Sequence, residues 1–191
     1  MRKTFSVLFV LFSLNVNARK LPGSDLNAES DIHFIGQTVL FRAGTGTHRR
    51  FFFKIYEVAL FLQNIKSRPE KIIDSTELKF VRLKFLRNLK ATQIIEGFND
   101  TFKENCFDQC ETLSPHLARF LEAISDMPKE SLIEFIFFHD KTVLSMPGRI
   151  NLSLPGSEFG KILLRAWLGA DPPSERFKRE LLQNLQSPVG F

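Results

Sequence analysis

The chain has 191 residues, of which 43% are hydrophobic and 25% are charged, and its formal net charge at pH 7 is +5. This length suits one domain with a real hydrophobic core. The charged residues are interspersed rather than gathered in a block, which is typical of a solvated surface, so the basic balance does not indicate a nucleic-acid partner.

The first 18 residues have the three parts of a secretory signal peptide. Arg2 and Lys3 form a short basic region, residues 7–14 are an almost unbroken apolar run, and residues 16–18 suit signal peptidase. The apolar run is too short to cross a bilayer, which takes about 20 residues. We therefore expect cleavage after Ala18, export to the periplasm or beyond the cell, and no transmembrane segment in the mature chain.

After the expected cleavage site, residues 19–30 are polar and contain Pro22 and Gly23. This composition predicts a flexible N-terminus of the mature chain. The rest of the sequence has no internal repeat and no low-complexity tract, so we expect one domain over residues 31–186.

The first half of this domain is typical of strands. Residues 32–42 predict an extended segment, and residues 49–62 predict a long strand because they are rich in Phe, Ile, Tyr and Val. The glycines of Gly44-Thr45-Gly46-Thr47 predict a turn between the two. Residues 77–87 alternate in hydrophobicity and predict a third strand.

The apolar spacing then changes to the helical period. Thr92 predicts the N-cap of a first helix, and Ser114-Pro115 predicts the start of a second. Three short strands follow, at residues 132–138, 142–146 and 149–154. Ser157 and Ser174 then predict the N-caps of two last helices.

This order of elements indicates an α+β fold. Strands come first, then helices, then a three-stranded meander, then helices again. An antiparallel sheet with helices packed on one face is the simplest structure of this kind. Strand and helix do not alternate, which argues against a doubly wound parallel sheet.

Standard motifs of catalysis and cofactor binding are absent from the sequence. It has no Gly-x-Ser-x-Gly, no His-Glu-x-x-His and no phosphate-binding loop, and Gly44-Thr45-Gly46 opens no helix. The histidines lack the spacing of metal ligands: His33, His48, His116 and His139. We therefore expect neither a metal nor a cofactor.

Cys106 and Cys110 lie four residues apart on a predicted helix. In an oxidising compartment such a pair is compatible with a disulfide, but a regular helix aims the two Cβ atoms poorly for one. A helix that ends near Cys106 would remove this strain. The sequence thus leaves two alternatives, a disulfide and two buried thiols.

Phenylalanine is unusually frequent, with 21 residues against one Trp and one Tyr. Most must lie in the core, although an aromatic interior can also line an apolar ligand cleft. The basic cluster His48-Arg49-Arg50 also has two interpretations. It can hold a carboxylate or another anion, or it can be a solvated strand end.

Three segments resemble the chalcone isomerase-like family. The first is Gly44-Thr45-Gly46-Thr47-His48-Arg49-Arg50 followed by Lys54-Ile55-Tyr56 and Leu60-Phe61-Leu62, which is similar to the signature of the family's long strand. The second is Leu83-Lys84-Phe85-Leu86-Arg87. The third runs from Leu154-Pro155-Gly156 through Trp167-Leu168-Gly169 to Leu181-Leu182 and is similar to exported bacterial members.

This resemblance covers about residues 32–185 and implies an open-faced sandwich, a large antiparallel sheet with a cleft between the sheet and its helices. The family includes plant enzymes that cyclise chalcones, relatives that bind fatty acids, and many uncharacterised bacterial proteins. In the enzymes an arginine, hydroxyl groups and an asparagine stabilise the developing negative charge.

On the strands, the family's catalytic positions are largely replaced. The arginine falls on His48, and a neutral imidazole is a poorer partner for an anion than a guanidinium. Arg49 is a possible substitute, but it needs a bulge to point into the cleft. The strand threonine falls on Tyr56, which non-enzymatic relatives often carry.

On the helices, the resemblance places the family's tyrosine at Phe98 and its second threonine at Ala166, so two hydroxyl donors are lost. The asparagine is retained as Asn105. His48, Tyr56 and Asn105 are the remaining catalytic candidates, and the ligand-binding candidates are His48, Arg49, Tyr56, Phe98, Asn105 and Ala166.

Three functions remain open at this point. We expect a non-catalytic protein that binds a small apolar or amphipathic molecule such as a fatty acid. The alternatives are an isomerase with Tyr56 and His48 as donors, and a structural or partner-binding protein with a filled cleft. The sequence names neither the ligand nor the oligomeric state.

Overall fold

Seven strands form one antiparallel sheet in which each strand pairs with the next along the chain, in the order β1 to β7. In the computed structural model of the chain, residues 31–64, 69–146, 148 and 151–185 are described. The predicted signal peptide and residues 19–30 lie outside these ranges. The strands are β1 (Ile32–Ile35), β2 (Thr38–Arg50), β3 (Phe53–Leu62), β4 (Lys79–Phe85), β5 (Leu132–Phe137), β6 (Lys141–Ser145) and β7 (Leu152–Pro155).

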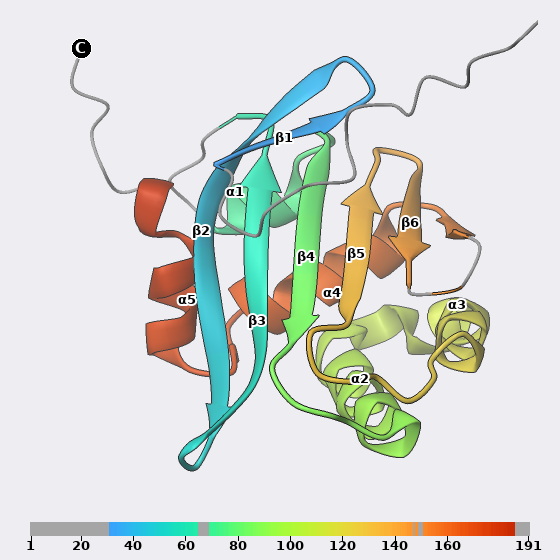
Figure 1. Cartoon of the computed structure of the whole chain (residues 1–191). Helices are drawn as coiled ribbons and strands as arrows, with labels where there is room; N and C mark the ends of the chain where they lie inside the picture. Colours follow the sequence, from blue (N-terminus) through green and yellow to red (C-terminus); the bar gives the residue numbers. More distant parts are fainter. Residues whose placement is uncertain (1–30, 65–68, 147, 149–150, 186–191) are drawn as a thin grey trace, which may run out of the picture. The chain divides into compact units, whose positions relative to one another are not determined.

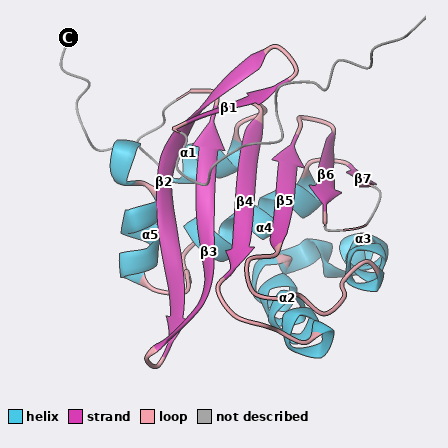
Figure 2. Ribbon diagram, in the orientation of Figure 1, coloured by secondary structure: helices cyan, strands magenta, loops and turns pink. Residues whose placement is uncertain are grey.

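The helices pack against one face of this sheet; in the view of Figure 1, α1 and α4 lie behind the strands and α5 lies beside β2. Figure 2 shows α2 below the ends of β4 and β5, and α3 below β6 and β7. The helices are α1 (Pro69–Asp74), α2 (Ala91–Asn105), α3 (Cys110–Glu122), α4 (Glu158–Leu168) and α5 (Glu175–Leu181), with short 3-10 turns η1 (Phe107–Gln109) and η2 (Gln183–Leu185). The predicted α+β fold is therefore confirmed. No helix in the described ranges is long and apolar enough to cross a bilayer.

The core between sheet and helices is built around aromatic rings in mutual contact. Phe120 of α3 lies 4.6 Å from Phe98, 6.0 Å from Phe159 and 6.4 Å from Phe135, measured between ring centroids. Trp167 of α4 packs edge-on against Phe135 at 5.7 Å. These separations are those of tilted and edge-to-face pairs, which add to the stabilisation from burial. Much of the high Phe content thus fills the interior.

A smaller cluster lies on the opposite face of the sheet and consists of Leu40, Ala59, Phe61 and Phe80. His33 stacks on Phe80 with 3.9 Å between ring centroids. This burial, followed by the charge of Arg82, lowers the pKa of His33. Apolar residues on both faces explain why hydrophobic and polar residues alternate less strictly in these strands than in a sheet with one solvent-exposed face.

The predicted turn at Gly44–Thr47 is wrong, because these residues lie inside β2. The glycines have a packing role instead. A Cβ at Gly44 would overlap the backbone of Glu180 and Leu181, and one at Gly46 would lie 2.8 Å from the backbone oxygen of Phe177. Helix α5 therefore lies directly on the β2 backbone, and only glycine permits this approach.

The real turn follows at Phe51-Phe52, between Arg50 and its partner Phe53. The predicted strand over residues 49–62 is thus two strands, β2 and β3, joined by a two-residue loop. The error has a clear origin: phenylalanine is a strand former and is not one of the usual turn residues. Phe51 nevertheless has a φ of 55°.

Two predicted helix starts also need correction. Helix α2 begins at Ala91, whose N–H donates to the Asp126 carboxylate at 2.9 Å, so Thr92 is not the cap. Helix α3 begins at Cys110 and contains Pro115 in its interior. In α2 a distant carboxylate provides the cap, and a single sequence does not reveal such a contact. By contrast, Ser174 caps α5 as predicted and accepts from the N–H of Phe177.

The two cysteines are bonded to each other, with Cα atoms 4.9 Å apart. Helix α2 ends at Asn105, and the turn η1 separates it from α3. Cys106 and Cys110 therefore do not share a regular helix, which is the condition under which the sequence favoured a disulfide. The bond fixes the corner between α2 and α3.

Candidate functional site

The structure brings two of the predicted site residues together on neighbouring strands. His48 of β2 and Tyr56 of β3 are register partners, and their ring centroids lie 4.8 Å apart. The rim of the phenol ring meets Phe177 of α5 edge-on at 6.4 Å. Both side chains therefore lie on the helix side of the sheet, where the family resemblance places the ligand.

The environment of Tyr56 keeps its hydroxyl protonated. Burial raises the pKa of Tyr56 to about 12, and a hydrogen-bond interaction with the Trp167 side chain works in the opposite direction. At neutral pH the phenol is thus a neutral group that can donate its proton to an acceptor. It is poorly suited to act as a base, because almost none of it is ionised.

His48 is also neutral at pH 7. Burial, followed by the positive charge of Arg50, lowers the pKa of this imidazole below its ordinary value of 6.5. A neutral imidazole still donates from one nitrogen and accepts at the other. The pair of His48 and Tyr56 therefore offers hydrogen bonds without a net charge.

Arg49 lies beside this pair but faces water. The strand register shifts between His48 and Arg49, which is the kind of irregularity that the sequence interpretation required. However, Arg49 is exposed, and its Nη1 donates to the backbone oxygen of Thr47 at 3.3 Å. The guanidinium is thus at the edge of the site rather than inside it.

The site residues that the sequence predicted on the helices make contacts other than with the His48–Tyr56 pair. Phe98 packs edge-to-face on Phe120. Asn105 ends α2, where its side-chain nitrogen donates to the backbone oxygen of Thr101 at 2.9 Å, and its own backbone oxygen accepts from Arg165. Ala166 packs against the core from α4. We find no contact that joins Phe98 or Asn105 to Tyr56 among the described residues.

Trp167 and Phe177 complete the surroundings of Tyr56, and sequence reasoning did not single out either one as a site residue. The only available signal for Trp167 was its position next to Ala166. Phe177 comes to Tyr56 because α5 packs on the β2 glycines, a contact over more than 120 residues of sequence.

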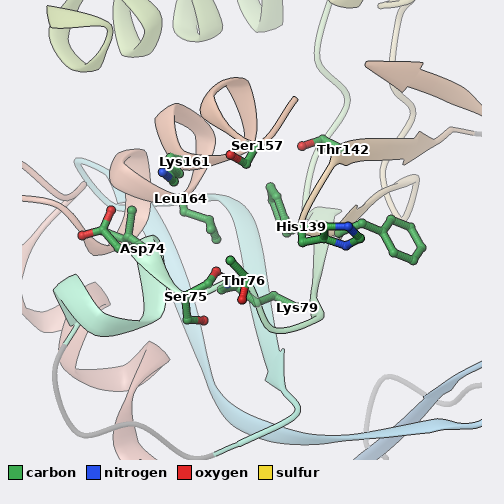
Figure 3. Close-up of a pocket in the computed structure, with 13 residues that line it drawn as sticks. Asp74, Ser75, Thr76, Lys79, His139, Thr142, Ser157, Lys161 and Leu164 are labelled. Atoms are coloured by element: carbon green, nitrogen blue, oxygen red, sulfur yellow. Dashed lines mark hydrogen bonds between the residues drawn. The ribbon is translucent and has the colours of Figure 1, made fainter. Parts of the chain in front are cut away.

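A small polar pocket lies at the other end of the sheet (Figure 3). It has a volume of about 50 Å³ and is lined by side chains from α1, the start of β4, the β5–β6 turn and the first turns of α4. Thr142 contributes a buried hydroxyl without a hydrogen-bond partner in the described chain. The pocket lies near the end of β3, six residues along this strand from Tyr56, which corresponds to about 20 Å.

This pocket is too small for an acyl chain, since drug-sized ligands occupy about 300–1,000 Å³. It holds Lys79 and Lys161, but both ammonium groups have acceptors within the protein: Lys79 donates to the Ser75 backbone, and Lys161 pairs with Glu158 at 2.6 Å. No group of three His, Cys, Asp or Glu that could hold a metal is present in the part of the chain that is described.

Comparison with known proteins agrees with this architecture. The family model described as chalcone isomerase-like matches residues 23–183. The chain belongs to the chalcone isomerase-like family. Among solved structures it is similar to a fatty-acid binding protein of Arabidopsis thaliana, with a TM-score of 0.60 and 14% identity over 79% of this chain and 90% of that one. No curated protein matches.

In this member of the chalcone isomerase-like family, His48 and Tyr56 lie opposite each other on paired strands. The resemblance described from the sequence assigns the family's arginine to His48, and the nearby Arg49 is exposed. The same resemblance assigns two hydroxyl positions to Phe98 and Ala166, and these assignments stay predictions. The His48–Tyr56 pair can hold a polar head group by hydrogen bonds, and the guanidinium of Arg49 beside it is exposed.

Proposed function

We propose that this chalcone isomerase-like protein binds a small amphipathic molecule such as a fatty acid and does not catalyse a reaction. The His48–Tyr56 pair carries this proposal. A protonated phenol and a neutral imidazole 4.8 Å apart, with aromatic neighbours, suit a carboxylate head group that needs donors. The name of the similar Arabidopsis protein supports the same ligand class.

The apolar part of the ligand would lie between the sheet and its helices. Several apolar side chains there are only partly buried, and they pack on the core from α2 and α3: Ile95, Phe98, Leu117 and Leu121. Partly buried apolar side chains can move apart at lower cost than the fully buried rings around Phe120. Binding therefore requires a local opening of the α2–α3 pair.

Catalysis of the chalcone isomerase type requires more donors than this site offers. Each donor at an oxyanion contributes about 3 kcal/mol to the transition state. With Phe98 and Ala166 in place of hydroxyls and His48 in place of arginine, we expect no rate above background with chalcones. Saturable turnover that disappears in Tyr56→Phe would contradict the proposal and favour the isomerase alternative.

The single tryptophan provides a direct assay for the ligand. Trp167 interacts with Tyr56, so its fluorescence should change when a fatty acid enters. We expect a saturable change with the delipidated chain, and about tenfold weaker binding for Tyr56→Phe, which corresponds to one hydrogen bond to a charged group. A fatty alcohol of the same length should bind more weakly than the acid.

Matched histidine variants separate recognition from general damage. His48→Gln should weaken the binding of the fatty acid, whereas His139→Gln should not, because His139 is exposed at the other end of the sheet. If the wild-type chain binds neither acid nor alcohol, the cleft is filled and the structural or partner-binding alternative stands.

We also propose that the protein is exported, most simply to the periplasm. The support for this proposal is the order of basic region, apolar run and small residues in the first 18 residues. A disulfide between Cys106 and Cys110 is compatible with an oxidising compartment. N-terminal sequencing of the protein from its host should begin at Arg19, and retention of Met1 would contradict export by this route.

A further inference from the structure

The tip of the β2–β3 hairpin exposes three consecutive phenylalanines. The exposed fractions are 86% for Phe51, 98% for Phe52 and 62% for Phe53. Large apolar side chains so fully in water are unusual, and three in a row form a continuous patch. Figure 1 shows that the hairpin extends past the end of β4, so the patch is at a projecting tip.

Packing does not explain these residues. Phe51 is the first residue of a two-residue hairpin loop and has a φ of 55°, a conformation that favours glycine or asparagine and costs other residues energy. A phenylalanine there is unfavourable both for the backbone and for contact with water. Residues that weaken the fold in this way are candidates for a function outside it.

Positive charges flank the aromatic tip. Arg49, Arg50 and Lys54 are exposed, and residues 48–54 contain no acidic residue. Arg87, from the end of β4, lies over the ring of Phe53 at 5.4 Å and adds a fourth cation. The nearby carboxylate of Glu180 is already bonded to Arg176 at 2.7 Å. The tip thus has an apolar end flanked by four positively charged side chains.

We propose that this hairpin tip docks on the surface of an anionic lipid bilayer. Aromatic side chains favour the boundary between head groups and acyl chains, and lysine and arginine bind anionic head groups at the level above it. The pairing of Arg50 with Phe53 also satisfies the backbone up to the loop, which a segment entering lipid requires.

The docking surface lies close to the proposed ligand site. His48 lies three residues before the loop on β2, and Tyr56 lies four residues after it on β3. Docking would therefore direct that end of the sheet toward the membrane, where amphipathic molecules are dissolved. The inference stands on the hairpin itself and does not require that the His48–Tyr56 pair binds a ligand.

Sedimentation of the full mature chain with lipid vesicles tests the proposal. We expect binding to vesicles of phosphatidylglycerol mixed with phosphatidylcholine, weaker binding to phosphatidylcholine alone, and a loss of binding as salt rises. Phe51→Ala/Phe52→Ala and Arg50→Glu/Lys54→Glu should each reduce the affinity for the anionic vesicles at least about tenfold.

Controls elsewhere on the surface distinguish a site from general stickiness. Phe34→Ala removes another exposed ring, 63% accessible on β1, and Lys103→Glu/Arg119→Glu reverses two exposed cations on α2 and α3. Neither should change binding appreciably. Equal binding by wild type and the tip variants would overturn the proposal.

Two further results would also overturn it. One is a wild-type chain that ignores anionic vesicles. The other is self-association through the tip, seen as a dimer in sedimentation velocity that becomes a monomer in Phe51→Ala/Phe52→Ala, without vesicle binding. Ligand titration in the absence of vesicles is a separate measurement, so failure of docking and failure of ligand binding remain distinguishable.

Discussion

Phenylalanine occupies two opposite environments in this protein, and the contrast separates what the fold needs from what it does not. Around α3 and α4, Phe120 is 0% exposed and touches rings from three other elements. At the β2–β3 tip, Phe52 is 98% exposed. The first region is close-packed like the interior of other proteins, whereas the Phe52 side chain is almost entirely in water.

This difference means that composition alone says little about role. The aromatic excess in the sequence fits both a core and a ligand cleft, and the structure shows a third environment, an exposed tip. Stability measurements should therefore divide the phenylalanines into two classes. The following predictions test that division, beginning with the largest effect.

Phe120→Ala should destabilise the protein by about 3–5 kcal/mol, because it removes a buried ring from a packed cluster and leaves a cavity. Phe52→Ala should change stability by less than about 0.5 kcal/mol, because its side chain is in water. Urea unfolding of both variants gives the comparison. Similar losses for the two would mean that the tip packs against something in the folded chain.

Gly44→Ala should cost about 1–3 kcal/mol, since its new methyl group would overlap the α5 backbone and force the helix away from β2. The matched control is Gly97→Ala in α2, where a Cβ meets nothing within 4 Å. That change should stabilise the helix by about 0.5–1 kcal/mol. Thermal unfolding should therefore shift in opposite directions for the two variants.

Tyr56 should titrate as a buried phenol. Its folded pKa of about 12 exceeds the ordinary value of 10.0, so its contribution to stability is complete below pH 10 and is lost as the pH rises toward 12. The chain has one tyrosine, so absorbance near 295 nm reports this group alone. At pH 11 about a tenth should be ionised in the folded chain and most in the chain unfolded by urea. A midpoint near 10 in the folded chain would place the phenol in water.

Phe51→Gly should have a small effect on the fold, with the opposite sign from a core mutation. Glycine relieves the positive φ of the loop, so stability should stay the same or rise by up to about 1 kcal/mol. In the same variant, binding to anionic vesicles should fall. A clear loss of stability would indicate that Phe51 packs in the folded state and would weaken its assignment to docking.

The sequence predicted most of the fold because most signals were local. Alternation identified the strands β5 and β6, and helical spacing identified the helices α4 and α5. The N-cap predicted at Ser174 is also the N-cap of α5 in the structure. The errors occurred where a distant segment decides the local structure. Gly44 and Gly46 resemble turn residues until α5 is placed on them, and the α2 cap comes from Asp126.

The candidate site was predictable to a similar extent. His48 and Tyr56 meet because they are opposite each other on a hairpin, and the family resemblance already aligned them. The roles of Trp167 and Phe177 depend on how α4 and α5 cross the sheet, which no spacing in the sequence encodes. The exposed turn at Phe51-Phe52 was missed because its residues contradict turn propensity.

The direct packing of α5 on the β2 glycines has a consequence for the order in which the structure assembles during synthesis. Each strand pairs with the one made just before it, so the sheet can grow as the chain emerges from the ribosome. The helix that covers β2 is made more than 120 residues later. Until then the glycine stretch and the side of Tyr56 that meets Phe177 remain uncovered, and a nascent chain cut short before Glu175 would retain an open, association-prone strand. Completion of α5 is therefore the step that covers the glycine stretch of β2.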